Sequence, residues 1–124
     1  MDARRFDESG AAQCEKLAMK SEAIVVLTTV PNLTEAETLA GKIVESKFAA
    51  CVQILPPMKS VYFWEGEVQT GSEHLLLIKT LAEKFDELEK FIQANHSYDV
   101  PEIIALAAER VSESYFDWMK NYLE

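Results

Sequence analysis

The sequence of 124 residues is short of several residue types, and each shortage argues against a class of protein. Its two cysteines, Cys14 and Cys51, lie far apart, so they form neither a disulfide framework nor a zinc-binding pattern. Its four glycines make a glycine-rich phosphate loop hard to build. Neither residues 24–30 nor residues 75–78 approach the roughly 18 apolar residues that a membrane helix needs. We therefore expect a soluble, cytoplasmic protein that has no membrane partner.

Basic residues are also scarce. The chain has 12 basic and 21 acidic residues and a net charge of −9, which opposes binding to nucleic acid and to anionic membranes. A cationic partner, above all a metal ion, is electrostatically easier. The sequence also lacks the local signatures of common enzyme classes, including the nucleophile elbow and the paired histidines of zinc proteases. These features favour a non-enzymatic protein that binds cations.

The start of the chain differs from the rest. Residues 1–21 mix charged and small side chains, and their longest apolar stretch has three residues. We therefore expect a flexible N-terminal tail over residues 1–21. The remaining length and composition fit one domain, over residues 22–124.

The next segments predict a strand and then a helix. Residues 23–30 are a β-branched run that ends at Pro31, which is typical of a buried strand. Asn32 and Glu35 have the spacing of a capping box, the reciprocal bonding that begins many helices. Apolar residues then follow at helical spacing until about Ser46.

The middle of the chain predicts a long hairpin. Residues 49–55 are apolar, two prolines then mark a bend at a sheet edge, and residues 60–64 resume the extended pattern. Glu65 and Gly66 supply a tight turn into a return strand that reaches Thr80.

The last third predicts a helix, a strand and a final helix. Thr80 and Glu83 repeat the capping-box spacing before an amphipathic helix. A strand is expected over residues 101–108, and Ser112 or Ser114 is expected to begin the last helix. The order is β-α-β-β-α-β with a C-terminal helix, which predicts an α+β, ferredoxin-like fold.

The predicted strands are apolar on both faces, as residues 24–27, 75–78 and 103–106 show. Two helices cover only one face of a four-stranded sheet, and a face open to solvent would alternate with polar residues. The simplest cover for the second face is another copy of the chain, in closed symmetry. We therefore expect a homo-oligomer.

Side chains that could bind a ligand or take part in chemistry gather in two segments. At the hairpin tip, Glu65 follows Trp64, and the pair forms either a solvated turn or part of a pocket for a cation. The second segment offers His96, Ser97, Tyr98, Asp99 and Glu102. It is either a polar loop after a helix or a set of ligands for a divalent ion such as Cu(II) or Zn(II).

Lys79 stands near the end of a predicted apolar strand. A lysine there must reach solvent, pair with a carboxylate or face a polar cavity. Glu102, at the start of the strand expected beside it, is a candidate partner.

Five segments are distinctive in their order and spacing. They are residues 26–30 (VLTTV), 48–54 (FAACVQI), 60–66 (SVYFWEG), 77–80 (LIKT) and 96–104 (HSYDVPEII). Together they resemble the CutA-type divalent-cation-tolerance family, over residues 22–124. The resemblance implies a tight, PII-like trimer in which the sheets surround a threefold axis and the long hairpins cross between subunits.

The resemblance also implies tolerance of copper and other divalent cations. It implies clefts between subunits that are lined by Trp64, Glu65, Lys79, His96, Tyr98 and Glu102. The copper ligands proposed in the family are a cysteine in the first strand, here Thr28, and a His-His pair, here Asn95 and His96. One imidazole for each subunit leaves most of a metal's coordination shell to carboxylates or water.

Three hypotheses follow. The first is a non-enzymatic homotrimer without a tightly bound cofactor, in which His96 with Glu65, Asp99 or Glu102 binds Cu(II) or another divalent cation weakly. The second is a PII-like sensor in which Lys79, Tyr98 and Trp64 hold a small anion. The third is a structural scaffold for partner proteins.

Overall fold

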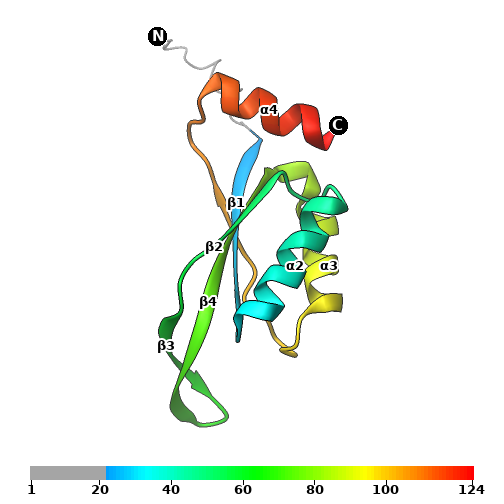
Figure 1. The fold of residues 1–124 in the computed structure, drawn as a ribbon. Helices are drawn as coiled ribbons and strands as arrows, with labels where there is room; N and C mark the ends of the chain where they lie inside the picture. The colour runs from blue at the N-terminus through cyan, green and yellow to red at the C-terminus, as the bar shows by residue number, and fades with distance from the viewer. Residues whose placement is uncertain (1–21) are drawn as a thin grey trace.

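The structure is a computed structural model, and it describes residues 22–124. The predicted tail over residues 1–21 lies outside the described residues. The described part contains five strands and three α-helices (Figure 1). In chain order they are β1 (Ala23–Val30), α2 (Leu33–Glu45), β2 (Cys51–Ile54), β3 (Met58–Trp64), β4 (Glu67–Leu81), α3 (Phe85–Asn95), β5 (Ile104–Ala107) and α4 (Glu113–Leu123), with a 3₁₀ turn at Ala82–Lys84 before α3.

The strands form one antiparallel sheet in the order β2-β4-β1-β5. The long strand β4 has two partners, because β2 pairs with its C-terminal part and β3 pairs with its N-terminal part. The β3–β4 hairpin extends beyond the helices (Figure 1). This order confirms the ferredoxin-like fold, and the first strand has the predicted bounds.

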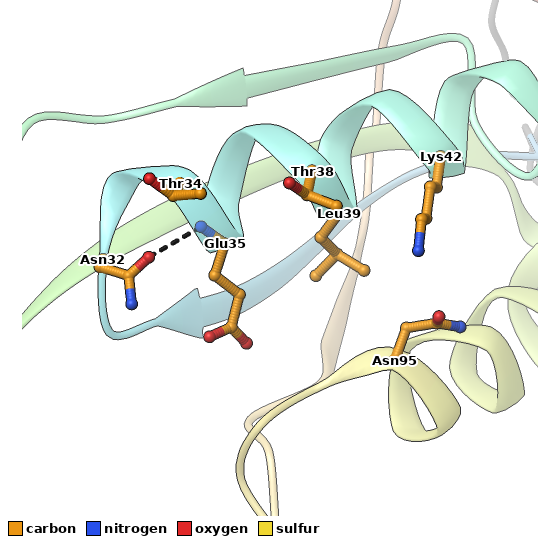
Figure 2. A pocket seen from close by; sticks show the side chains of 7 residues that line it. All are labelled: Asn32, Thr34, Glu35, Thr38, Leu39, Lys42 and Asn95. Atoms are coloured by element: carbon orange, nitrogen blue, oxygen red, sulfur yellow. Dashed lines mark hydrogen bonds between the residues drawn. The ribbon is translucent and has the colours of Figure 1, made fainter.

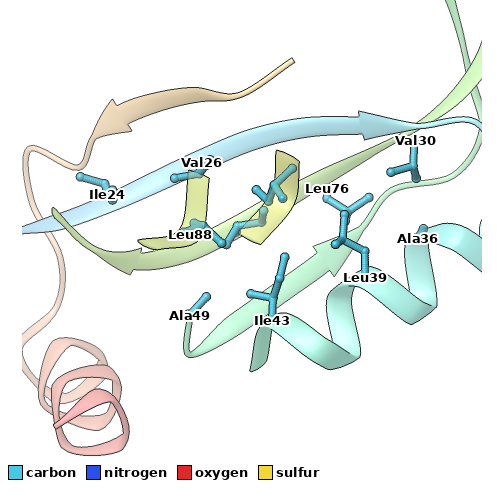
Figure 3. Close-up of a cluster of buried hydrophobic side chains, with 11 residues drawn as sticks. Ile24, Val26, Val30, Ala36, Leu39, Ile43, Ala49, Leu76 and Leu88 are labelled. Atoms are coloured by element: carbon cyan, nitrogen blue, oxygen red, sulfur yellow. The ribbon is translucent and has the colours of Figure 1, made fainter. Parts of the chain in front are cut away.

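The main core lies between one face of the sheet and the helices α2 and α3. Apolar residues at helical spacing on each helix meet alternate residues of β1 and β4, as the helical and strand periods dictate (Figure 3). The buried cluster consists of Ile24, Val26, Val30, Ala36, Leu39, Ile43, Ala49, Leu76, Ile78, Leu88 and Ile92.

Helix α4 closes a smaller core at the end of the sheet where β1 begins. Met119 and Leu123 pack there with Ala23 and Leu81. The Tyr122 hydroxyl donates a 2.6 Å hydrogen bond to the Val44 carbonyl oxygen, which ties α4 to α2. Among the described residues, every helix is too short or too polar to span a membrane.

The opposite face of the sheet has no helical layer over most of its area (Figure 1). The strand register places six apolar side chains on this face: Val25, Leu27, Leu75, Leu77, Ile104 and Leu106. We call these six residues the open apolar face. Ile104 is 47% exposed and Leu106 is 51% exposed. The prediction that the strands are apolar on both faces is confirmed.

Two boundaries of the second half were predicted wrongly. Thr80 does not cap a helix, because β4 continues to Leu81 and the Thr80 hydroxyl donates to the Phe48 carbonyl oxygen at 2.7 Å. The last strand is shorter than residues 101–108, since its pairing with β1 begins only at Ile104. Ser112, rather than Ser114, precedes the last helix, without a side-chain capping bond.

Two buried threonines provide a matched pair of substitutions. Both are fully buried, but the Thr28 hydroxyl has no hydrogen-bond partner within residues 22–124, whereas the Thr80 hydroxyl has one. We expect Thr28→Val to raise the free energy of unfolding by about 1 kcal/mol, since a desolvated hydroxyl is removed. Thr80→Val is expected to lower it by about 1–2 kcal/mol, since the Phe48 carbonyl loses its partner. Urea unfolding measures both free energies. An equal loss of stability in the two variants would contradict the finding that only the Thr80 hydroxyl has a hydrogen-bond partner.

Candidate functional site

A cleft of about 770 Å³ lies beside the β3–β4 hairpin and the loop of residues 98–102. Its volume falls within the range of about 300–1,000 Å³ that is usual for small-molecule sites. We call it the acidic cleft, because its chemically distinctive lining consists of Tyr62, Trp64, Glu73, Tyr98, Asp99 and Glu102.

The hairpin wall depends on a two-residue turn. Glu65 and Gly66 both have positive φ angles, 53° and 81°, which matches the twist of the flanking strands in a tight hairpin. The side-chain amide of Gln69 also donates to the Trp64 carbonyl oxygen at 2.9 Å. Tyr62 and Trp64 alternate with Phe63 along β3, so they share the face of the hairpin that lines the cleft.

The loop wall is anchored by His96, whose side chain is fully buried. Its Nε2 lies 2.7 Å from the Thr29 carbonyl oxygen, and its Nδ1 lies 3.0 Å from the Tyr98 backbone nitrogen. Because a carbonyl oxygen only accepts, Nε2 carries the proton and Nδ1 accepts from the Tyr98 N–H. The imidazole therefore joins the loop to the end of β1.

Glu35 provides a second anchor for this loop. Its backbone N–H donates to the Asn32 side chain at 2.8 Å, which confirms Asn32 as the helix cap. Its carboxylate accepts from the Ser97 backbone N–H at 3.1 Å and from the Ser97 hydroxyl at 2.9 Å. The predicted reciprocal capping bond of Glu35 is thus replaced by a contact with a loop 62 residues away.

Tyr98 connects the two walls of the cleft. Its hydroxyl donates to a carboxylate oxygen of Glu73 on β4 at 2.9 Å. Burial, followed by the hydrogen bond to Glu73, raises the pKa of Tyr98 well above its usual value. The phenol therefore remains a protonated donor at neutral pH.

The structure brings four of the seven predicted site residues together. Trp64, Tyr98, Asp99 and Glu102 all line the acidic cleft. Glu65 is exposed in the turn after Trp64. His96 lies behind Tyr98, with 4.9 Å between the ring centroids, and would have to give up one of its two hydrogen bonds to bind a metal ion.

Lys79 does not line the acidic cleft of its own chain. It is six residues from Glu73 along β4, or about 20 Å at the usual rise of a strand. Its ammonium group lies 5.8 Å from the centre of the Tyr115 ring. The register pairs Val25 with both Lys79 and Leu106, so Glu102 lies toward the opposite end of β1. The suggested pairing of Lys79 with Glu102 within one chain was therefore wrong.

The acidic cleft does not contain a preformed metal centre within one chain. Among residues 22–124, no group of three or more His, Cys, Asp or Glu side chains is arranged to hold a metal ion. The predicted ligands His96, Glu65, Asp99 and Glu102 therefore do not converge on one point in the single chain.

A second, smaller pocket of about 250 Å³ was not predicted from the sequence. It lies between α2 and α3 and is lined by Thr34, Glu35, Thr38 and Lys42 on α2 and by Asn95 on α3 (Figure 2). Glu35 belongs both to this pocket and to the anchor of the cleft loop. The two helices are far apart in sequence, so their shared pocket has no local signature.

The fold and the cleft together define a class of protein. It is a small α+β protein whose ferredoxin-like sheet exposes an apolar face and whose hairpin borders an acidic cleft. The family described as "CutA1 divalent ion tolerance protein" matches residues 24–122. The chain belongs to this family, as the sequence resemblance predicted.

Known relatives are similar to most of this chain in sequence or in structure. "Protein CutA 1, chloroplastic" of Oryza sativa subsp. japonica is 46% identical over 118 residues, which cover 95% of this chain and 67% of the relative. "Divalent-cation tolerance protein CutA" of Thermus thermophilus is 45% identical over 78% of this chain and 94% of the relative. The structure of the "Periplasmic divalent cation tolerance protein CutA" of Archaeoglobus fulgidus superposes with a TM-score of 0.80, at 38% identity, over 82% of this chain and 99% of that one.

The comparison with plant relatives adds two facts. The chain spans 67% of the length of the rice relative and 62% of a relative from Arabidopsis thaliana. The rice alignment is also longer than the described part of this chain, so the similarity extends into residues 1–21. The resemblance was expected to cover only residues 22–124.

Proposed function

We propose that the chain assembles as a homotrimer and binds divalent cations, copper included, weakly at the acidic cleft. The family is named for divalent ion tolerance, and the two prokaryotic relatives carry the same description. The open apolar face supports assembly, since an apolar area of this kind is usually covered by a partner. In such an assembly the acidic cleft lies next to the covered face.

The observation that carries cation binding is the charge of the cleft. Glu73, Asp99 and Glu102 line it, and its lining includes no lysine, arginine or histidine. The whole chain carries a net charge of −9, which adds to the attraction. Since three ligands do not converge within one chain, a metal ion would keep much of its water, which makes the binding weak.

His96 has a positioning role in this proposal. The imidazole holds the loop from which Asp99 and Glu102 project, and both of its nitrogens are already bonded. A direct bond from His96 to a metal stays a prediction. The PII-like anion sensor is less favoured, because Lys79 lies far from the cleft within one chain.

We propose that the protein catalyses no reaction, in keeping with a family named for ion tolerance and a sequence without common enzyme motifs. A cytoplasmic location stays a prediction, because the rice relative is named as chloroplastic and the Archaeoglobus protein as periplasmic.

Calorimetric titration of the intact protein with Cu(II) tests the cation site. Glu102→Gln is expected to weaken binding at least about threefold at low salt, since one of three lining carboxylates is neutralised. Glu109→Gln is the matched control, because Glu109 is exposed beyond the other end of β5. Equal isotherms for the wild-type protein and Glu102→Gln would contradict a site at the cleft.

A further inference from the structure

We propose that the pocket between α2 and α3 binds a small zwitterion in which a short methylene chain separates an ammonium group from a carboxylate. This pocket, which we call the helix pocket, has a volume of about 250 Å³ and is lined by residues from both helices. Its ligand would lie between Glu35 and Lys42. The inference goes beyond the proposed function, because the helix pocket is separate from the acidic cleft.

The helix pocket remains accessible in the proposed homotrimer. Helices α2 and α3 cover one side of the sheet, and the open apolar face lies on the other side (Figure 1). Assembly through the open apolar face therefore places the neighbouring copies on the side away from this pocket. Its lining residues Thr34, Thr38 and Lys42 are exposed on α2.

Two charges of opposite sign mark the ends of the helix pocket. Glu35 lies in the first turn of α2, and Lys42 lies in its last turn. Their separation of seven residues corresponds to about 10 Å along the helix axis. They share one face of α2 but are too far apart for the ion pairs that form at spacings of three or four residues. Within residues 22–124 Lys42 has no salt bridge, so its ammonium group is free to bind an anion.

The lining between these charges combines an apolar side chain with hydrogen-bonding groups. Leu39 lies between Glu35 and Lys42 on α2, where it can pack against a methylene chain (Figure 2). Figure 2 also shows the Lys42 side chain pointing toward Asn95 on α3. The side-chain nitrogen of Asn95 donates to a carbonyl oxygen of its own helix at 2.9 Å, which fixes the amide at the edge of the pocket.

The Glu35 carboxylate has room for a ligand. It accepts from the Ser97 backbone N–H at 3.1 Å and from the Ser97 hydroxyl at 2.9 Å. An ionised carboxylate offers about four acceptor positions, so these two bonds leave others for an ammonium group. The Ser97 N–H is therefore a natural reporter of binding, since a cation beside Glu35 would change the hydrogen bond that it donates.

The lining argues against other classes of ligand. A simple anion would be repelled by Glu35 and a simple cation by Lys42, whereas a zwitterion gains from both charges. A metal ion needs several donor atoms that converge on one point, and residues 22–124 provide no such group of three. The volume of about 250 Å³ lies below the usual range of about 300–1,000 Å³, which limits the ligand to a small molecule.

The probes are 4-aminobutanoate, butanoate and butylamine, which share a four-carbon chain and differ in which ends are charged. Each is titrated into the intact, full-length protein at neutral pH and at matched, low ionic strength, because salt screens such contacts. The backbone amide signals of Lys42 and Ser97 in NMR spectra follow the binding. We expect 4-aminobutanoate to bind at least about threefold more tightly than either analogue, since an exposed ion pair contributes up to about fivefold in affinity.

Lys42→Gln removes the partner of the ligand carboxylate. We expect it to weaken the binding of 4-aminobutanoate by about two- to fivefold and to leave butylamine binding no weaker. Lys42→Arg keeps the positive charge and should retain the wild-type preference for 4-aminobutanoate. Lys90→Gln is the matched control, because Lys90 is exposed on α3 outside the lining of the helix pocket. It should bind all three probes as the wild-type protein does.

Circular dichroism and sedimentation of each variant verify that its fold and assembly are retained. If Lys42→Gln fails this check, Thr38→Asp takes its place, since a carboxylate four residues before Lys42 would pair with its ammonium group and weaken 4-aminobutanoate binding. Equal affinities for the three probes, no change of the amide signals with 4-aminobutanoate, or an unchanged affinity of the folded variant would overturn the inference. These titrations contain no metal ion, so their outcome is independent of Cu(II) binding at the acidic cleft.

Discussion

In the proposed homotrimer, Leu106→Asp is expected to separate the assembly into single chains. Leu106 is 51% exposed on the open apolar face, where it lies opposite Val25 in the sheet register. Assembly through this face would place the new carboxylate in an apolar interface without a partner. The cost of burying such a charge is several kcal/mol for each copy, and a trimer incurs it three times. The summed cost of burying the three carboxylates should therefore exceed the free energy that holds the interface together.

Sedimentation velocity measures this change as a fall from about three times the mass of the chain to one. Gln93→Asp, on the exposed side of α3, is the matched control and should leave the sedimentation unchanged. Circular dichroism verifies the fold of the variant, and Ile104→Asp on the same face provides a second test. An unchanged mass for both folded variants would exclude the open apolar face as the interface.

His96→Ala is expected to lower the free energy of unfolding of the metal-free protein by about 2–4 kcal/mol. The substitution empties the space of a fully buried ring and removes two hydrogen bonds, which leaves the Thr29 carbonyl and the Tyr98 N–H unpaired. Ser97→Ala is the graded control, since it removes only the exposed hydroxyl contact with Glu35. We expect that control to cost about 0.5–1 kcal/mol.

The measurement is urea unfolding in the presence of a chelator, at one protein concentration, because the proposed assembly would also contribute to stability. A residue that acts only as a metal ligand would not stabilise the metal-free protein. Unchanged stability of His96→Ala would therefore contradict the positioning role and would favour direct ligation by His96.

Much of the fold was predictable because its signals are local. The β-branched run of β1, the cap at Asn32 and the turn at Glu65 and Gly66 each depend on a few neighbouring residues, and each is confirmed. The capping box at Thr80 was a local signal that tertiary structure overrode. Leu81 pairs with Ala23 at the end of the sheet, so the backbone there remains extended.

The candidate site was predictable only in part, because distant residues build it. The hairpin-tip sequence indicated Trp64, and the loop sequence indicated Tyr98, Asp99 and Glu102. The fold brings these four residues to one cleft. The contribution of Glu73 and the link from Glu35 to Ser97 depend on strand register and on helix placement. Single-sequence patterns carry no information about such long-range contacts.

The acidic cleft and the open apolar face lie on the same side of the sheet, since Thr29 and Glu73 alternate in register with Leu27 and Leu75. A ligand that touches two chains across this surface would couple binding to assembly. By thermodynamic linkage, such a ligand would tighten the oligomer by the same factor by which assembly tightens its own binding. Its apparent affinity would then rise with protein concentration, which would make this small chain responsive to its own abundance.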